Sequence, residues 1–368
     1  MTAETETPAA GETGEIGAYV RGYLGRLRGG DIGSLPAVAG LLVLCVLFGI
    51  LRPSFFTALN FANLFTQGAA VAVIAMGLVF VLLLGEIDLS AGFASGVCAA
   101  VMAVAMSRHG VPWPIGLLAA IVTGTVIGAA LGFLVAKVGI PSFVVTLAAF
   151  LAFQGAVLVI IGEGGNVGVH DPVLVAIANG NLPVWLGWVL YLVGVLVFAG
   201  VLVADRLVRR RGGLPVEPVA VLSARIGTVA LVMGAAVYVL NLERAVNPAF
   251  RSLKGVPVVV PVILGLLVVG TILLNRTKYG RHLYATGGNA EAARRAGIPV
   301  DRIRMSAFVL CSTLAAVGGI IAASRANSVD PNAGGSNTLL YAVGAAVIGG
   351  TSLFGGKGRL RDAIIGGA

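Results

Sequence analysis

Residues 113–136, with the sequence WPIGLLAAIVTGTVIGAALGFLVA, contain no charged side chain. A helix needs about 20 mainly apolar residues to cross the hydrocarbon core of a bilayer, and this stretch is long enough. Glycine recurs within it at Gly124, Gly128 and Gly132. Small residues at this spacing let membrane helices approach one another closely. The stretch therefore predicts a membrane-spanning helix that packs within a bundle.

The composition extends this prediction to the whole chain. Its 368 residues are 58% hydrophobic and 11% charged, and the mean hydropathy is +0.98, whereas about 25% of residues in an ordinary soluble domain are charged. We therefore expect an all-α membrane protein, a polytopic transmembrane helix bundle of about ten spans. The apolar blocks that predict the spans cover residues 35–51, 67–84, 89–106, 113–136, 142–161, 184–204, 226–240, 258–274, 305–324 and 338–349.

The distribution of Lys and Arg predicts how the spans are oriented. Cytoplasmic loops of membrane proteins are enriched in these residues. If the N-terminus is cytoplasmic, 19 of the 25 Lys and Arg residues fall on the inner side and 6 on the outer side. The loop at residues 244–254 fits least well, because it places three cations outside. The count favours a cytoplasmic N-terminus.

The two ends of the chain differ from the apolar blocks. Residues 1–33 are polar and acidic, then mildly basic, and lack the layout of a cleavable signal. We expect a disordered cytoplasmic tail there and a membrane domain over residues 34–368. The last residues, RDAIIGGA, begin an apolar run too short to cross a membrane. Either the C-terminus is truncated or this piece only dips into the membrane, and we expect truncation.

Several functional classes are unsupported by the residues. The net charge is +9, but the basic residues form short clusters between apolar blocks without interleaved aromatic residues, so we expect no nucleic-acid binding. Cysteines within apolar blocks indicate buried side chains rather than a disulfide framework. The histidines lie far apart, so we expect neither a metal site nor a cofactor. These residues are Cys45, Cys98, Cys311, His109, His170 and His282.

The sequence GEIDLSAG, residues 85–92, places two carboxylates between long apolar blocks. Charged groups near the membrane interior are costly and usually face a cavity or a partner. Gly85 and Gly92 favour a broken helix, and unwound backbone at membrane depth is tolerated where it lines a cavity or is buried in protein. We therefore predict that Glu86, Asp88 and Ser90 line a solute path. The alternative is a tight inner turn with solvated carboxylates.

The predicted inner loop at residues 275–304 contains a short helix. Asn289 can cap it, Glu291 suits its first turn, and Gly297 marks its end. The helix exposes Arg294 and Arg295. It is either a solvated connection or a docking element that transmits motion from a cytoplasmic ATPase, and we predict the latter.

Residues 349–358, GGTSLFGGKG, resemble a phosphate-binding loop but do not match its pattern. With Lys357 as the lysine of that motif, Thr351 stands where glycine is required and Gly358 where Ser or Thr is required. We expect a flexible inner turn. The chain is then not an enzyme, and a separate subunit would hydrolyse ATP.

The four motifs GEIDLSAG, PSFVVTLAAFLAFQG, TKYGRHLYATGGNAEAARRAGI and GGTSLFGGKG together resemble the monosaccharide (ribose and xylose) branch of bacterial ABC importer permeases, with the xylose type closest. The resemblance covers residues 60–368. It implies a homodimer in the bacterial plasma membrane, in contact with membrane lipid. It also implies a cytoplasmic ATPase subunit that docks after Asn289 and an extracytoplasmic sugar-binding protein.

Three classes of function compete on this basis. A permease subunit of an ATP-binding-cassette importer would carry a monosaccharide, xylose or a related sugar, without chemistry of its own. A secondary transporter would use Asp88 or Glu86 as a proton relay. A membrane-embedded enzyme would need a nucleophile or a metal cluster at depth, and the sequence offers none. We predict the importer permease.

Overall fold

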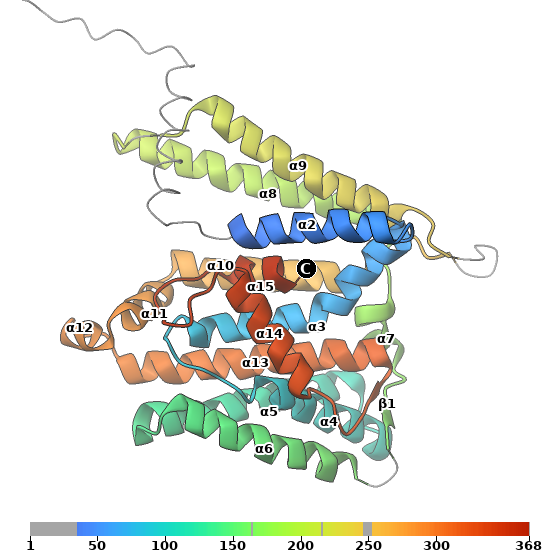
Figure 1. Ribbon diagram of the computed structural model, residues 1–368, viewed down its shortest axis with the longest axis vertical. Coiled ribbons are helices and arrows are strands. Elements are labelled where there is room, and N and C mark those ends of the chain that lie inside the picture. Colours follow the sequence, from blue (N-terminus) through green and yellow to red (C-terminus); the bar gives the residue numbers. More distant parts are fainter. Residues whose placement is uncertain (1–34, 163–164, 215, 246–251, 368) are drawn as a thin grey trace, which may run out of the picture. The chain divides into compact units, whose positions relative to one another are not determined.

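The computed structural model describes residues 35–162, 165–214, 216–245 and 252–367 (Figure 1). The expected tail at residues 1–33 lies outside this part. The chain divides into two units. The larger unit comprises Ser34–Asn181 and Pro257–Ala368, and the smaller unit is described within Leu182–Val256. Each is considered by itself below.

The larger unit is almost entirely helical. A single pair of two-residue strands, β1 (Val167–Gly168) and β2 (Ser328–Val329), is antiparallel in the described part and pairs Val167 with Val329. The helices are α2 (Leu35–Leu51), α3 (Ala58–Leu82), α4 (Ala91–His109), α5 (Trp113–Phe133), α6 (Ser142–Ile161), α7 (Pro172–Asn179), α10 (Val259–Arg276), α11 (Lys278–Gly288), α12 (Ala290–Arg295), α13 (Val300–Ala326), α14 (Ser336–Ile348) and α15 (Leu360–Gly367), and a π-helical turn, η1 (Leu134–Val138), follows α5.

The smaller unit contains two helices, α8 (Val184–Arg211) and α9 (Val219–Asn241), which pack against each other as a hairpin. The Tyr191 hydroxyl of α8 donates a 3.1 Å hydrogen bond to the carbonyl of Ala230 in α9. Outside this contact line, the hairpin is largely exposed within its unit.

The helices confirm an all-α polytopic membrane protein. Every predicted apolar block falls on a helix, and eight described helices are long and apolar enough to cross a membrane. The helices α2 and α14 carry shorter apolar stretches. The exact number of spans and the cytoplasmic N-terminus stay predictions.

The core of the larger unit forms around α13, which packs most extensively against α5, α3 and α4 (Figure 1). The predicted glycine stripe of α5 faces α13. A Cβ added at Gly124 would lie 2.6 Å from the Ser312 carbonyl, and one at Gly132 would lie 2.8 Å from the Met305 Cα. The stripe therefore marks a helix contact where only glycine fits, as predicted from its spacing.

Candidate functional site

The chain between α3 and α4 is not helical over residues 83–90. Gly85 closes the end of α3 with a φ of 73°, a left-handed conformation that glycine adopts without steric cost. The α4 helix begins only at Ala91. The helix is thus broken where the two predicted carboxylates lie, and we call residues 83–90 the broken segment.

The broken segment runs into the bundle alongside α13. Near its start, Glu86 Oε1 lies 3.3 Å from Arg304 Nε, close to the first turns of α13. Further on, Asp88 interacts with Cys311, near the middle of that helix. Seven residues of helix span about 10 Å, so Asp88 lies well inside the bundle. This is where unwound backbone is tolerated if protein surrounds it.

The Asp88 carboxylate is buried and held locally. It is 1% exposed. Its Oδ1 accepts hydrogen bonds from the backbone amide of Ser90 at 2.9 Å and from the Ser90 hydroxyl at 2.7 Å. Oδ2 accepts no hydrogen bond in the described part of the chain, although the carboxylate lies beside Cys311. Asp88 and Ser90 therefore form a pair, and one carboxylate oxygen retains capacity to accept a hydrogen bond.

Two side chains of α6 replace the helical hydrogen bonds that the broken segment lacks. Ser142 Oγ accepts from the Ile87 amide at 3.3 Å, and the Thr146 hydroxyl donates to the Ile87 carbonyl at 3.1 Å. Buried peptide groups need partners, and this pair supplies both for Ile87. The motif PSFVVTLAAF thus supports the break from a neighbouring helix.

Three glycine-containing segments meet beside the broken segment, and we call Gly85, Gly287, Gly355 and Gly356 the glycine junction. A Cβ on Gly287 would collide with the Leu83 carbonyl, and a Cβ on Gly355 would lie 2.8 Å from the Gly287 carbonyl and 2.9 Å from the Gly85 nitrogen. The Gly356 amide donates a 2.8 Å hydrogen bond to the Leu83 carbonyl. The broken segment, the end of α11 and the C-terminal loop between α14 and α15 therefore meet backbone to backbone at these glycines.

The predicted short helix is α12, which follows α11 directly. Asn289 caps it by accepting a 2.9 Å hydrogen bond from the Ala292 amide, and Gly297 follows its end with a φ of 80°. Figure 1 shows α12 and α7 at opposite ends of the larger unit. We call these the α12 end and the α7 end.

The two arginines of α12 differ in their partners. Arg294 Nη2 lies 3.2 Å from Asp301 Oδ1 at the start of α13, and Lys137 Nζ reaches the other oxygen of Asp301 at 3.3 Å. Arg295 Nε lies 3.1 Å from Glu291 Oε1, within the same helix, and its side chain is 80% exposed. Arg294 is thus tied to the bundle, whereas Arg295 is presented outward.

The C-terminal loop between α14 and α15 is more ordered than the expected flexible turn. The Thr351 hydroxyl and the Arg359 amide donate to Asp362 Oδ2 at 3.2 and 2.7 Å. The Tyr284 hydroxyl donates to the Gly358 carbonyl at 2.8 Å. Burial raises the pKa of the Asp362 carboxyl. These bonds order the loop and hold it against α11. The comparison with a phosphate-binding loop gave no indication of this structural role.

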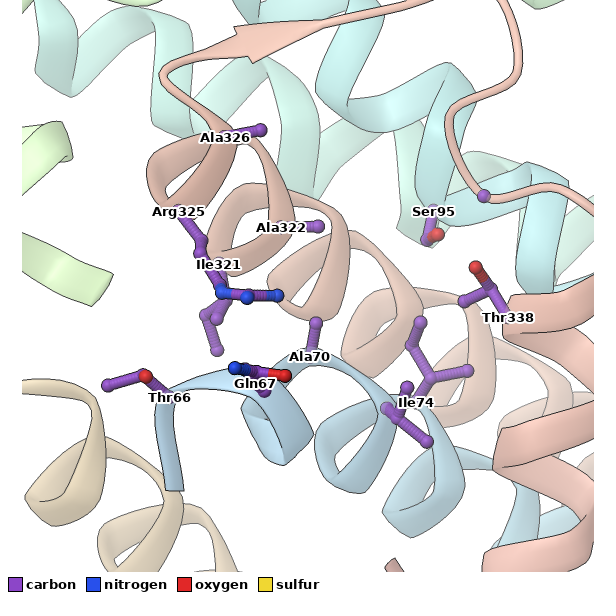
Figure 2. A pocket seen from close by; sticks show the side chains of 12 residues that line it. Thr66, Gln67, Ala70, Ile74, Ser95, Ile321, Ala322, Arg325, Ala326 and Thr338 are labelled. Atoms are coloured by element: carbon purple, nitrogen blue, oxygen red, sulfur yellow. The ribbon is translucent and has the colours of Figure 1, made fainter. Parts of the chain in front are cut away.

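A pocket of about 440 Å³ lies between α3, α4, α13 and the start of α14. Figure 2 shows Gln67 and Arg325 pointing into it, with Thr338 and Ser95 on the opposite side. It is formed by the middle of α3 and the last turns of α13, and α13 packs against α7, so the pocket lies toward the α7 end.

Sequence reasoning did not identify this pocket. The sequence predicts that the second apolar block begins at Gln67, whereas α3 begins at Ala58. Thr57 caps the helix by accepting a hydrogen bond from the Asn60 amide. Gln67 therefore lies more than two turns inside a helix. A glutamine directly before the apolar run 68–82 was the available signal.

The predicted residues fall into two groups. Glu86, Asp88 and Ser90 lie together in the broken segment. Asn289, Glu291, Arg294, Arg295 and Gly297 lie in or beside α12. The structure does not bring the two groups into direct contact, but the glycine junction joins the elements that carry them.

Comparisons with known proteins give a consistent result. A family described as "Branched-chain amino acid transport system / permease component" matches residues 60–368. The chain is 35% identical over 313 residues to the xylose transport system permease protein of Escherichia coli (strain K12), which covers 85% of this chain and 77% of that protein. It is 34% identical over 316 residues to the same-named protein of Haemophilus influenzae, covering 85% and 80%. It is 31% identical over 333 residues to the ribose import permease protein of E. coli (strain K12), covering 90% and 81%. No solved structure matches.

Proposed function

Since the chain belongs to this permease family, whose match extends over residues 60–368, we propose that it is the membrane subunit of an ATP-driven importer for a monosaccharide, xylose or a related sugar. The observation that carries the substrate class is the similarity to xylose and ribose permeases over 85–90% of the chain. A separate subunit supplies ATP hydrolysis, so the chain itself is not an enzyme.

The geometry supports different partners at the two ends of the larger unit. The α12 end, with Asn289, Glu291, Arg294, Arg295 and Gly297, docks the cytoplasmic ATPase. Arg295 is the outward-facing cation there. An extracytoplasmic sugar-binding protein delivers sugar at the α7 end, and two copies of the permease assemble as a homodimer.

Glu86, Asp88 and Ser90 form the barrier in the sugar path. Asp88 and Ser90 have almost no exposed surface, so the path is closed at their level in the conformation described here. Carboxylates accept strong, charge-assisted hydrogen bonds from hydroxyl groups, and Asp88 Oδ2 is available for such a bond. The glycine junction connects this barrier to the docking element, which gives the ATPase a mechanical route to it.

Transport by the assembled complex tests this proposal. The permease is reconstituted into proteoliposomes with its ATPase, and uptake of radiolabelled xylose and ribose is measured with the binding protein outside and ATP inside. We expect sugar uptake that requires both partners. Uptake driven by a pH gradient without the ATPase would instead support a proton-coupled carrier. Uptake of leucine but of neither sugar would overturn the assigned substrate.

Cysteine labelling of whole cells tests the orientation. We expect an impermeant thiol reagent to label Asn166→Cys and Asp171→Cys from outside but not Ala290→Cys. Because α12 lies at the opposite end of the larger unit from α7, labelling of Ala290→Cys from outside would invert the assignment of the two ends.

A further inference from the structure

The pocket near the α7 end has polar side chains without protein partners. Within the described residues, no hydrogen bond or ion pair engages the side chains of Gln67, Arg325 or Thr338, although all three line the pocket. Figure 2 shows the Gln67 amide and the Arg325 guanidinium directed toward its centre. Their hydrogen-bonding capacity is therefore available to a bound molecule or to water.

The position of Gln67 argues against a side chain that faces lipid. Gln67 directly precedes the apolar run 68–82 of α3, and polar side chains in membrane segments usually face a partner or a water-filled cavity. The pocket volume of about 440 Å³ falls within the range of about 300–1,000 Å³ found for small-molecule sites. The pocket can therefore hold a small solute together with water.

The chemistry of the lining fits a neutral, hydroxyl-rich solute. Sugar hydroxyls donate and accept; a glutamine amide and a threonine hydroxyl can each do both, and an arginine donates from a fixed fork of N–H groups. Among the described residues, no Asp or Glu lines the pocket, so no carboxylate there attracts a cationic solute. Ile74 and Ile321 supply apolar walls between the polar groups.

We propose that Gln67, Arg325 and Thr338 form a sugar-binding subsite in this pocket, which receives the solute before it reaches the broken segment. The proposal rests on the importer function proposed above. Ser95 also lines the pocket, and it follows Ser90 by little more than one helical turn. The subsite thus lies directly next to the proposed barrier.

The arrangement also explains how the sugar is released. Gln67 belongs to α3, Arg325 to α13 and Thr338 to α14. A shift of one helix against another separates the three side chains and weakens every combined contact. A site built from one side chain on each of three helices therefore binds in one conformation and releases in another.

Uptake kinetics of the full complex test the subsite. Gln67→Ala and Arg325→Gln should each lower xylose uptake about tenfold, the effect of losing one good hydrogen bond. Arg325→Lys, which keeps the charge but not the fork, should recover part of the activity. Arg52→Gln is the matched control, because Arg52 does not line the pocket. The basal ATPase rate of the assembled complex should stay unchanged in the Arg52→Gln control.

A chemical readout separates binding from a general folding defect. Ala322→Cys, on the exposed pocket wall, is introduced with Cys45→Ser and labelled by a soluble thiol reagent in the complex. Xylose should slow the labelling, and Gln67→Ala should abolish that protection. Wild-type sugar uptake with unchanged kinetics in both pocket variants would overturn the subsite alone. Protection by leucine but not by xylose would overturn its assignment to sugars, and absence of wild-type sugar uptake would instead reject the importer function.

Discussion

The central helices of the larger unit and the two helices of the α8–α9 hairpin are all long and apolar enough to cross a membrane. They differ in how closely they pack against other helices. In α3, α4 and α13, more than half of the residues in the 18-residue apolar stretch are buried. The corresponding share is 6% in α8 and zero in α9. Yet α8 is more apolar than any of those three helices. Lipid tails are as apolar as leucine, so apolarity alone does not drive membrane helices together.

Glycine environments separate the two regions. In the central bundle, added Cβ atoms at Gly77, Gly124 and Gly318 would lie within 3 Å of atoms in neighbouring helices. In the hairpin, Gly200 and Gly227 have open space around them. The comparison shows that a glycine is required for helix contact only where atoms of a neighbouring segment lie against it. The predictions below test this distinction.

The largest effect is expected at the glycine junction. Gly287→Val would force a side chain against the Leu83 carbonyl and should abolish sugar uptake, because it separates α11 from the broken segment. Uptake and the amount of permease in the membrane are measured together. Gly288→Ala is the matched control, since nothing lies within 4 Å of its added Cβ. Equal uptake by both variants would contradict the role of the junction.

Charge reversal on α12 should have the next largest effect. Arg294→Glu and Arg295→Glu should each abolish uptake while membrane insertion stays intact, because both remove a cation from the proposed docking surface. Arg295→Glu is the cleaner test, since among the described residues the ion pair of Arg295 stays within α12, whereas that of Arg294 reaches Asp301 of α13. Co-purification of the ATPase is the measurement, with Arg52→Glu as the control. Normal co-purification and uptake in both α12 variants would remove the docking role.

A smaller effect is expected for Asp88→Asn. The amide oxygen can still accept from Ser90, so the melting temperature in detergent should hardly change. Uptake should fall about tenfold, because charge-assisted hydrogen bonds are roughly twice as strong as neutral ones. Transport at the wild-type rate would show that Asp88 is a structural residue of the break and not part of the sugar path.

The same substitution in two helices gives the finest comparison. In α5, Gly128→Ala would clash with the Phe308 carbonyl of α13 and should cost about 1–3 kcal/mol of stability. In α9, Gly227→Ala meets nothing within 4 Å and should be neutral or stabilising by about 0.5–1 kcal/mol, since alanine favours a helix over glycine. Thermal unfolding in detergent measures both. Equal losses would break the distinction between the two regions.

Much of the fold could be predicted because apolar length is a local property. Every predicted block falls on a helix, and the glycines around Asp88 correctly indicated the break. The start of α3 was placed nine residues late, because Asn60, Asn63 and Gln67 lower the local hydropathy while Thr57 still caps the helix. A polar residue in an apolar stretch can lie either in a helix or in a loop before it. The sequence alone does not distinguish these cases without the residues that contact it.

The arrangement of the site could be predicted only in part. The motifs around Asp88 and Asn289 were recognised separately, but nothing in either shows that Gly287 touches Leu83. A backbone contact between distant segments is visible in the sequence only as a glycine at the contact position. In a chain with 53 glycines, such a position does not stand out. The pocket was missed for a similar reason, since Gln67 and Arg325 converge only in the folded bundle (Figure 2).

The glycine junction also has a consequence for the order of biosynthesis. Its three segments lie around residues 83–85, 287 and 355–356, and a chain emerges from the ribosome from its N-terminus onward. The Leu83 carbonyl cannot accept the hydrogen bond from Gly356 until the helices α3 to α14 have been synthesised. The broken segment therefore acquires this bond late, after those helices have been made.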